Sequence, residues 1–263
     1  MKRCITAGKK IRSCVVCMID ATGSMEEALK ITKSTIQEVF EAADTYLDDN
    51  NLKSAFEMQF VVYRNYTSKE LILQKSNWSS EPSTLFTFLD EKGFHEGGQG
   101  YEAIEVAFEH VVHERTNGRE ITQVILIGDA PPNKRDSILR KKNRNGNGPF
   151  WDTYEDGRYA SLFDVEDMLP HMVDSNGVAI PIQAFYVDSD QKRELLEDTK
   201  QVFGRLAERT HGECFQFDVK NKKKVIDLIT RTILYDTTNR NVNLSEAEKE
   251  SFKKLIDDRF PCY

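Results

Sequence analysis

Three side chains that carry oxygen lie within the short segment Asp20-Ala21-Thr22-Gly23-Ser24. One carboxylate and two hydroxyls at this spacing can surround a hard cation such as Mg2+, which prefers oxygen ligands and keeps several of its waters. Gly23 allows the backbone to turn back tightly between the two hydroxyls. The apolar run at 14–19 comes directly before Asp20 and predicts a strand. We therefore expect the segment at the carboxyl end of a strand, where open α/β sheets bind their ligands.

A second carboxylate, Asp129, follows another apolar run at 122–127. A strand made almost entirely of apolar residues is typical of the buried centre of a parallel sheet. If this strand neighbours the first, both carboxylates face one ion. A glycine-rich stretch at 93–100 lies between them in the sequence.

The rest of the chain alternates short apolar runs with amphipathic stretches. This pattern predicts an α/β fold with a doubly wound, mostly parallel sheet. The run at 70–74 follows a strand at 57–63 after a short polar turn and predicts one antiparallel edge strand. Further strands are expected at 179–187 and 214–219, and helices at 25–47, 83–89, 101–113, 159–174, 191–209 and 222–234. The segment Ser245-Glu246-Ala247-Glu248 has the spacing of a capping box and predicts a last helix.

These elements fit one domain from 12 to 236, with a polar insertion at about 133–158 and a C-terminal helical extension at 237–263. The insertion follows Asp129, so we expect it at the same edge of the sheet as the carboxylates. Its basic residues, among them Lys141 and Lys142, can attract an acidic partner electrostatically.

Composition limits the possible classes of protein. The 263 residues carry a formal net charge of -7, which does not favour nucleic acid as a partner. The sequence has no apolar run of the roughly 18 residues that a membrane span needs, and no apolar segment of a secretory signal. We therefore expect a cytoplasmic protein with reduced thiols. Cys14 and Cys17 form a C-x-x-C pattern, but residues three apart in a strand point to opposite faces, which predicts two separate core thiols.

The motifs resemble those of von Willebrand factor A domains. Asp20-x-Thr22-x-Ser24 is similar to the D-x-[ST]-x-S signature in the first loop of that family's metal-ion-dependent adhesion site, and Asp129 resembles the aspartate of its third loop. A closer resemblance is to the A domains found beside atypical alpha-kinases, which carry D-S-T-G-S-M, Y-R-D, G-G-G-D-x-P-E and D-A-P-P. The counterparts are Asp20-Ala21-Thr22-Gly23-Ser24-Met25, Tyr63-Arg64-Asn65, Gly97-Gly98-Gln99-Gly100-Tyr101-Glu102 and Asp129-Ala130-Pro131-Pro132. The resemblance covers residues 12 to 235 and includes no kinase catalytic domain.

This resemblance implies a module for protein–protein interaction and not an enzyme. It implies a divalent cation, with Mg2+ preferred and Mn2+ or Ca2+ as alternatives. One coordination position would accept a Glu or Asp carboxylate from a partner protein, in intracellular scaffolding or recruitment or within a larger assembly. The second loop lacks the family's threonine and has His95 and Glu96 in its place. Imidazole nitrogen is a softer donor than Mg2+ prefers, so Glu96 would replace the hydroxyl, or a water would fill its position. The residues expected to hold the cation are Asp20, Thr22, Ser24, Asp129 and Glu96. The expected partner contacts are Gly97, Gly98, Lys141 and Lys142.

Two other classes of function compete with this hypothesis. A phosphoryl-transfer hydrolase of the haloacid dehalogenase type would use Asp20 as its nucleophile. Such enzymes resemble D-x-D-x-T, in which the second acid shuttles protons, and Thr22 cannot do so near neutral pH. A metal-independent structural subunit of a larger complex would keep the fold and retain the cation site only as a relic. The stretch 98–103 matches G-x-G-x-x-A, but it lacks the preceding apolar strand of a dinucleotide-binding loop.

Overall fold

A computed structural model of the chain describes residues 13–50, 56–91, 100–134, 136–137, 165–189, 193–218, 220–240 and 244–260. Its strands are β1 (Ser13–Asp20), β2 (Phe56–Tyr63), β3 (Leu73–Lys75), β4 (Gln123–Gly128), β5 (Ile182–Val187) and β6 (Cys214–Phe217). Its helices are α1 (Glu26–Asp49), α2 (Pro82–Glu91), α3 (Ile104–Thr116), α6 (Val165–Met168), α7 (Arg193–Arg209), α8 (Lys222–Arg240) and α9 (Glu246–Arg259). Short 3-10 turns cover Gly23–Met25, Tyr66–Leu71 and Leu169–His171.

The strands form one sheet of six, in the order β3-β2-β1-β4-β5-β6. Strand β3 runs antiparallel to β2, and the remaining neighbours are parallel. The doubly wound fold with one antiparallel edge strand is therefore confirmed. From β1 the chain builds the sheet outward through β2 and β3, and it then returns to place β4 on the other side of β1. The order of the sheet reverses between β1 and β4, and their carboxyl ends border the crevice in which such folds bind ligands.

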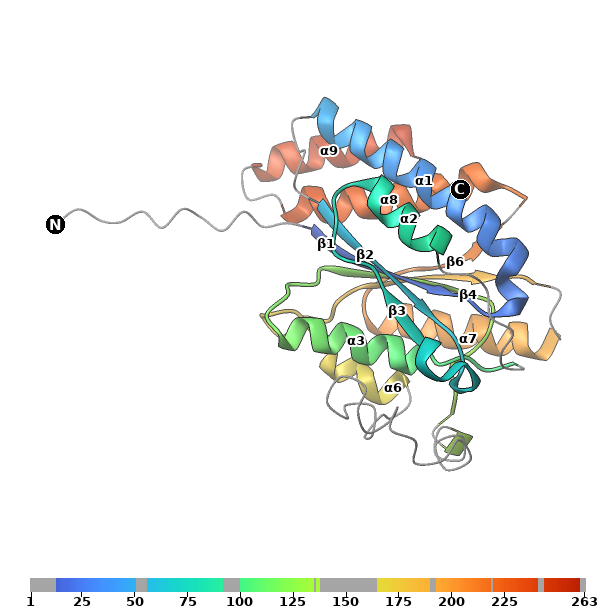
Figure 1. The fold of residues 1–263 in the computed structure, drawn as a ribbon. Coiled ribbons are helices and arrows are strands. Elements are labelled where there is room, and N and C mark those ends of the chain that lie inside the picture. Colours follow the sequence, from blue (N-terminus) through green and yellow to red (C-terminus); the bar gives the residue numbers. More distant parts are fainter. Residues whose placement is uncertain are drawn as a thin grey trace.

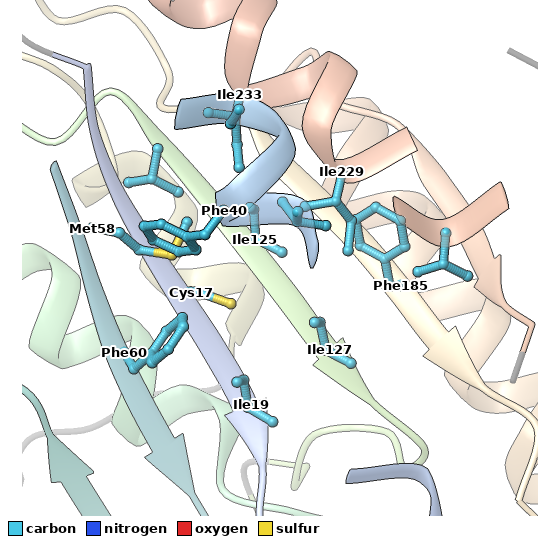
Figure 2. Close-up of a cluster of buried hydrophobic side chains, with 14 of the residues drawn as sticks. Cys17, Ile19, Phe40, Met58, Phe60, Ile125, Ile127, Phe185, Ile229 and Ile233 are labelled. Atoms are coloured by element: carbon cyan, nitrogen blue, oxygen red, sulfur yellow. The ribbon is translucent and has the colours of Figure 1, made fainter. Parts of the chain in front are cut away.

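Helices cover both faces of the sheet, as Figure 1 shows. Helices α1, α2, α8 and α9 lie on one face, and α3, α6 and α7 lie on the other. A strand between two helical layers must bury both of its faces, and every residue of β1 is buried. Side chains alternate along β1, so Cys17 and Ile19 pack with Phe40 of α1 and Ile229 of α8 in the cluster of Figure 2.

The opposite face of β1 packs a second cluster. Val16 and Met18 lie with Phe108 of α3 and Phe203 of α7. Full burial of an aliphatic or aromatic side chain contributes about 1.5–3 kcal/mol each, so the two clusters hold β1 firmly in the middle of the sheet. Cys14 is also buried and, by the same alternation, points away from the Cys17 cluster; both are free thiols. The expected separation of the two thiols is confirmed.

The C-terminal part of the chain packs on the same core. Helix α8 continues past residue 236 to Arg240, and α9 lies against it. The predicted capping box is present, because the Ser245 hydroxyl accepts from the backbone N–H of Glu248 and the Glu248 carboxylate accepts from the backbone N–H of Ser245. The Phe260 ring packs edge-on against Tyr46 of α1, with ring centroids 6.2 Å apart. Among the helices within the described ranges, none is long and apolar enough to cross a membrane.

Candidate metal centre

Asp20 and Asp129 lie at the same edge of the sheet. Asp20 is the last residue of β1, and Asp129 follows Gly128, the last residue of β4. The two strands are parallel neighbours in which Ile19 pairs with Ile127. Because the paired strands end together, their carboxylates meet between two loops that leave toward opposite faces of the sheet. Both side chains are buried, with exposed fractions of 0% for Asp20 and 1% for Asp129.

The first loop is organised around the Asp20 carboxylate. Its Oδ1 accepts hydrogen bonds from the Thr22 backbone N–H at 2.8 Å and from the Thr22 hydroxyl at 2.7 Å. The Ser24 hydroxyl lies 3.2 Å from that of Thr22. Asp20 Oδ2 is buried and receives no hydrogen bond from the residues that the structure describes. The three residues singled out in this loop are thus brought together around one carboxylate.

The loop changes from buried to exposed over a few residues. Asp20 and Thr22 are buried, whereas Gly23 and Ser24 are exposed at the start of the 3-10 turn that leads into α1. A hydrogen bond from the Met25 backbone N–H to the Thr22 carbonyl closes this turn. The site therefore opens to solvent at Ser24.

The third-loop carboxylate is held by neighbouring strands and helices. The Ser189 hydroxyl, two residues beyond β5, donates to Asp129 Oδ2 at 2.7 Å. The Thr199 hydroxyl of α7 donates to the Asp129 carbonyl at 3.3 Å. Gly128 is required for the close packing behind the site, because a Cβ there would lie 2.4 Å from the Tyr63 hydroxyl.

Buried negative charge accumulates around these two acids. The pKa of Asp20 is raised well above its usual range, first by burial and then by the negative charge of Asp129. Burial also raises the pKa of Tyr63, and nearby carboxylates add to this effect. The four acids that act on Tyr63, each at most 2% exposed, are Asp20, Asp129, Glu102 and Glu105.

Positive charge near the site comes from Arg64. Burial lowers the pKa of Arg64 to about 10, and the Asp20 charge acts in the opposite direction. The Arg64 Nη1 atom donates to the Leu71 carbonyl at 2.6 Å and to Gln74 Oε1 at 3.0 Å, on the β3 side. Asp20 is the acid whose charge acts on Arg64, and burial of a charge costs free energy unless an opposite charge compensates it. The arrangement thus favours an additional cation.

The residues present fit a hard divalent cation. Carboxylate and hydroxyl oxygens are the ligand types that Mg2+ accepts, usually beside retained waters. Within the described ranges, no three His, Cys, Asp or Glu side chains are grouped closely enough to hold a metal by themselves. A cation here would therefore also depend on the hydroxyls of Thr22 and Ser24 and on water.

Several predicted site residues lie outside the described residues. They are His95 and Glu96 of the second loop, Gly97 and Gly98 beside them, and Lys141 and Lys142 of the insertion. Conversely, the sequence analysis missed Ser189 and Glu105. Ser189 carries only a weak signal, because it is one polar residue after an apolar strand. Glu105 lies in the first turn of α3, where an acid is expected for reasons of the helix dipole alone.

Glu105 also links three segments behind the site. Its Oε1 accepts from the Tyr66 hydroxyl at 2.6 Å and from Asn133 Nδ2 at 3.3 Å. Tyr66 follows β2, and Asn133 follows the loop of Asp129. This buried carboxylate therefore connects the end of β2, the start of α3 and the loop after β4.

Comparison with known proteins bears on the fold. No protein-family model matches the chain, and no curated protein matches it in sequence. Among solved structures, the pilus adhesin SpaC from Lactobacillus rhamnosus GG, in its open conformation, matches with a TM-score of 0.55 at 10% sequence identity. The match covers 89% of this chain and 31% of the adhesin, so the chain spans about a third of that protein's length. At this identity the likeness supports the doubly wound fold alone.

Proposed function

We propose that this chain is a von Willebrand factor A-type domain that binds a divalent cation, preferentially Mg2+, and uses it to bind a carboxylate of a partner protein. The observation that carries the proposal is the convergence of Asp20, Thr22 and Ser24 with Asp129 at the switch point between β1 and β4. These four side chains would hold the ion, directly or through water.

The electrostatics of the site support a bound cation. Burial and the charge of Asp129 both disfavour the ionised form of Asp20, whereas a divalent ion would favour it. When bound, the cation supplies a positive coordination position that an anionic group can occupy. Ser24 and Gly23 are exposed, so the side chain of a partner can reach that position from solvent.

The same geometry gives little support to phosphoryl transfer. An aspartyl-phosphate enzyme of this type needs a second acid close to the nucleophile to carry the proton. The first loop after Asp20 places Thr22 at that position, and its hydroxyl donates to Asp20 Oδ1.

The decisive experiment is isothermal titration calorimetry of Mg2+ into metal-stripped protein. The test variant is Ser24→Ala, because Ser24 is exposed and its loss leaves the core intact. The matched control is Ser34→Ala, an exposed serine farther along α1 whose hydroxyl bonds only within its helix. We expect saturable binding by the wild type and the control, and binding by Ser24→Ala weakened by about an order of magnitude. Absence of binding to Mg2+, Mn2+ and Ca2+ in the wild type would refute the proposal.

Recognition of a carboxylate needs a second measurement. Bound Mn2+ enhances water proton relaxation, and an anionic ligand that displaces coordinated water lowers this enhancement. A short, C-terminally amidated peptide with one Glu should lower this enhancement at high concentration, whereas the same amidated peptide with Gln should not. Equal effects of the two peptides would leave cation binding intact but contradict its role in carboxylate recognition.

A further inference from the structure

A pocket of about 350 Å3 lies at the end of the sheet opposite to the candidate metal centre. One wall is formed where β4, β5 and β6 begin. Gln123 is the first residue of β4, Gln183 is the second residue of β5, and Phe215 is the second residue of β6. Helix α8 provides the facing wall. The pocket is therefore separate from the site at Asp20 and Asp129, which lies where β1 and β4 end.

One face of α8 lines this pocket. The contributing residues are spaced three and four apart, which places them on the same side of the helix. They are Leu228, Arg231, Thr232, Tyr235, Asp236 and Asn239. On the α8 side of the sheet, Ile125 of β4 and Phe185 of β5 belong to the apolar core, whereas Gln123 and Gln183 precede them on that same side. Polar side chains thus face one another at the edge of the core, which is typical of a binding site rather than of packing.

The pocket presents hydrogen-bond acceptors to a ligand. Gln123 is only 3% exposed, and its Oε1 receives no hydrogen bond within the part of the chain that the structure describes. Asp236 Oδ2 accepts from the Thr122 hydroxyl at 2.6 Å and from the Ser13 hydroxyl, which hold this carboxylate at the pocket wall. A buried acceptor costs free energy until a donor reaches it. These two groups favour a ligand with N–H donors.

The charged groups of the pocket favour a cation. With His211 neutral, the ionised side chains that line it are Glu213, Asp236 and Arg231. The Arg231 Nε atom donates to Asp257 Oδ1 of α9 at 2.9 Å, so the single positive charge is compensated from outside the pocket. The two acids therefore give the pocket a negative potential, which attracts a positively charged ligand.

We propose that this pocket binds a guanidinium group. A guanidinium is planar and carries its N–H donors in a fixed fork, which suits an amide oxygen and a carboxylate such as those of Gln123 and Asp236. Its faces stack on aromatic rings, and Phe215 and Tyr235 line the same pocket. A small alkylguanidine and the arginine side chain of a partner protein both carry this group. The site is independent of the proposed cation site between β1 and β4.

The test is an NMR titration of the full chain with butylguanidinium, compared among wild type and three variants. Gln123→Leu removes the buried acceptor, and Asp236→Asn removes the charge and keeps an oxygen for Ser13 and Thr122. The matched control is Gln216→Leu, because Gln216 is an exposed glutamine of β6 that points to the other face of the sheet. We expect millimolar binding by wild type and control, as suits a ligand of few atoms. Each pocket variant should bind at least about ten-fold more weakly, because a hydrogen bond to a charged group is lost or weakened.

Two further ligands test the charge and the source of the group. Butylurea has a similar planar shape and N–H donors without the charge, and it should bind at least about ten-fold more weakly than butylguanidinium. Acetyl-arginine amide represents a protein side chain; tighter binding than butylguanidinium would identify a partner protein as the source, and weaker binding would identify a small alkylguanidine. Melting temperatures establish that each variant is folded.

Three outcomes would overturn the inference. They are no saturable binding of butylguanidinium by the wild type, equal binding by wild type and Gln123→Leu, and equal binding of butylurea and butylguanidinium. Each of them would leave the proposed function standing, because Asp20 and Asp129 are not part of this pocket.

Discussion

Asp129→Asn should change the stability of the protein in opposite directions with and without the cation. In metal-free protein, Asp20 and Asp129 are two buried acids at adjacent strand ends, and the charge of Asp129 raises the pKa of Asp20. Asparagine removes that charge and keeps an oxygen that can accept from Ser189. Its amide group can donate to the Asp20 carboxylate. The two acids of the wild type already share a side-chain hydrogen bond, so the substitution removes the charge repulsion and keeps one hydrogen bond between the pair.

The expected magnitudes can be worked out for both conditions. A hydrogen bond to a charged group contributes about 1.5–3 kcal/mol. At about 2–4 °C per kcal/mol for a chain of this size, metal-free Asp129→Asn should melt about 3–12 °C above metal-free wild type. In the wild type, Mg2+ at about 100 times its Kd should add about 2.7 kcal/mol, or about 5–11 °C. In Asp129→Asn this gain should nearly vanish, because one of the two charged ligands is lost.

Differential scanning calorimetry in EDTA and in excess Mg2+ measures all four values. Asp174→Asn provides a control, since Asp174 is a buried acid in the loop before β5, away from the carboxyl ends of the strands. Its Oδ1 accepts from the backbone N–H groups of Asn176 and Val178. That variant should lose stability in both conditions and keep the Mg2+-dependent gain. If metal-free Asp129→Asn melts below metal-free wild type, the electrostatic reasoning about the Asp20 and Asp129 pair is wrong.

Three further predictions concern the surrounding fold. Gly128→Ala should lower the free energy of unfolding by about 1–3 kcal/mol in urea denaturation, because the added Cβ would lie 2.4 Å from the Tyr63 hydroxyl. Adding Tyr63→Phe should restore part of this loss, and no recovery would contradict the contact. Burial raises the pKa of Cys14 to about 11 and also raises the pKa of Cys17. Iodoacetamide at mildly alkaline pH should therefore leave both thiols unalkylated unless urea is present, as peptide mass spectrometry can measure. Rapid labelling of the native protein would count against the packing of β1. Ser245→Ala should lower the free energy of unfolding by about 0.5–2 kcal/mol in chemical denaturation, and Ser245→Asp should lower it much less. Equal losses in the two variants would exclude the capping box as the cause.

The parts of the site that depend on strand ends could be predicted from the sequence. Two apolar runs, each followed by an aspartate, predict that Asp20 and Asp129 converge if the two strands are neighbours, and the structure supplies that condition by pairing Ile19 with Ile127. The spacing within the first loop predicts by local geometry alone that Thr22 lies beside Asp20 and Ser24 beside Thr22. Ser189 could not be predicted in the same way, because one serine after an apolar strand belongs to no motif that marks it as a site residue.

One predicted helix is shorter in the structure because of its local sequence. The sequence analysis predicts a helix at 159–174, and within the described part of that range the structure has only Val165–Met168 and a 3-10 turn that ends at His171. Pro170 lacks the backbone N–H that a continuing helix needs. Val173 then pairs with Ala179 across a turn in which Gly177 has a φ of +78°, a conformation that favours glycine. The apolar spacing of this segment predicts a longer helix than Pro170 allows.

The position of β1 between β2 and β4 has a consequence for folding kinetics. Ile19 pairs with Ile127, so a long loop must close before the two carboxylates can meet. Contacts between residues so distant in sequence slow folding. A fragment that ends before β4 would keep the first loop and lack its charged counterpart. A cation should therefore slow unfolding of the native protein and leave the refolding rate nearly unchanged, since the pair of carboxylates that binds it exists only once β1 and β4 lie side by side.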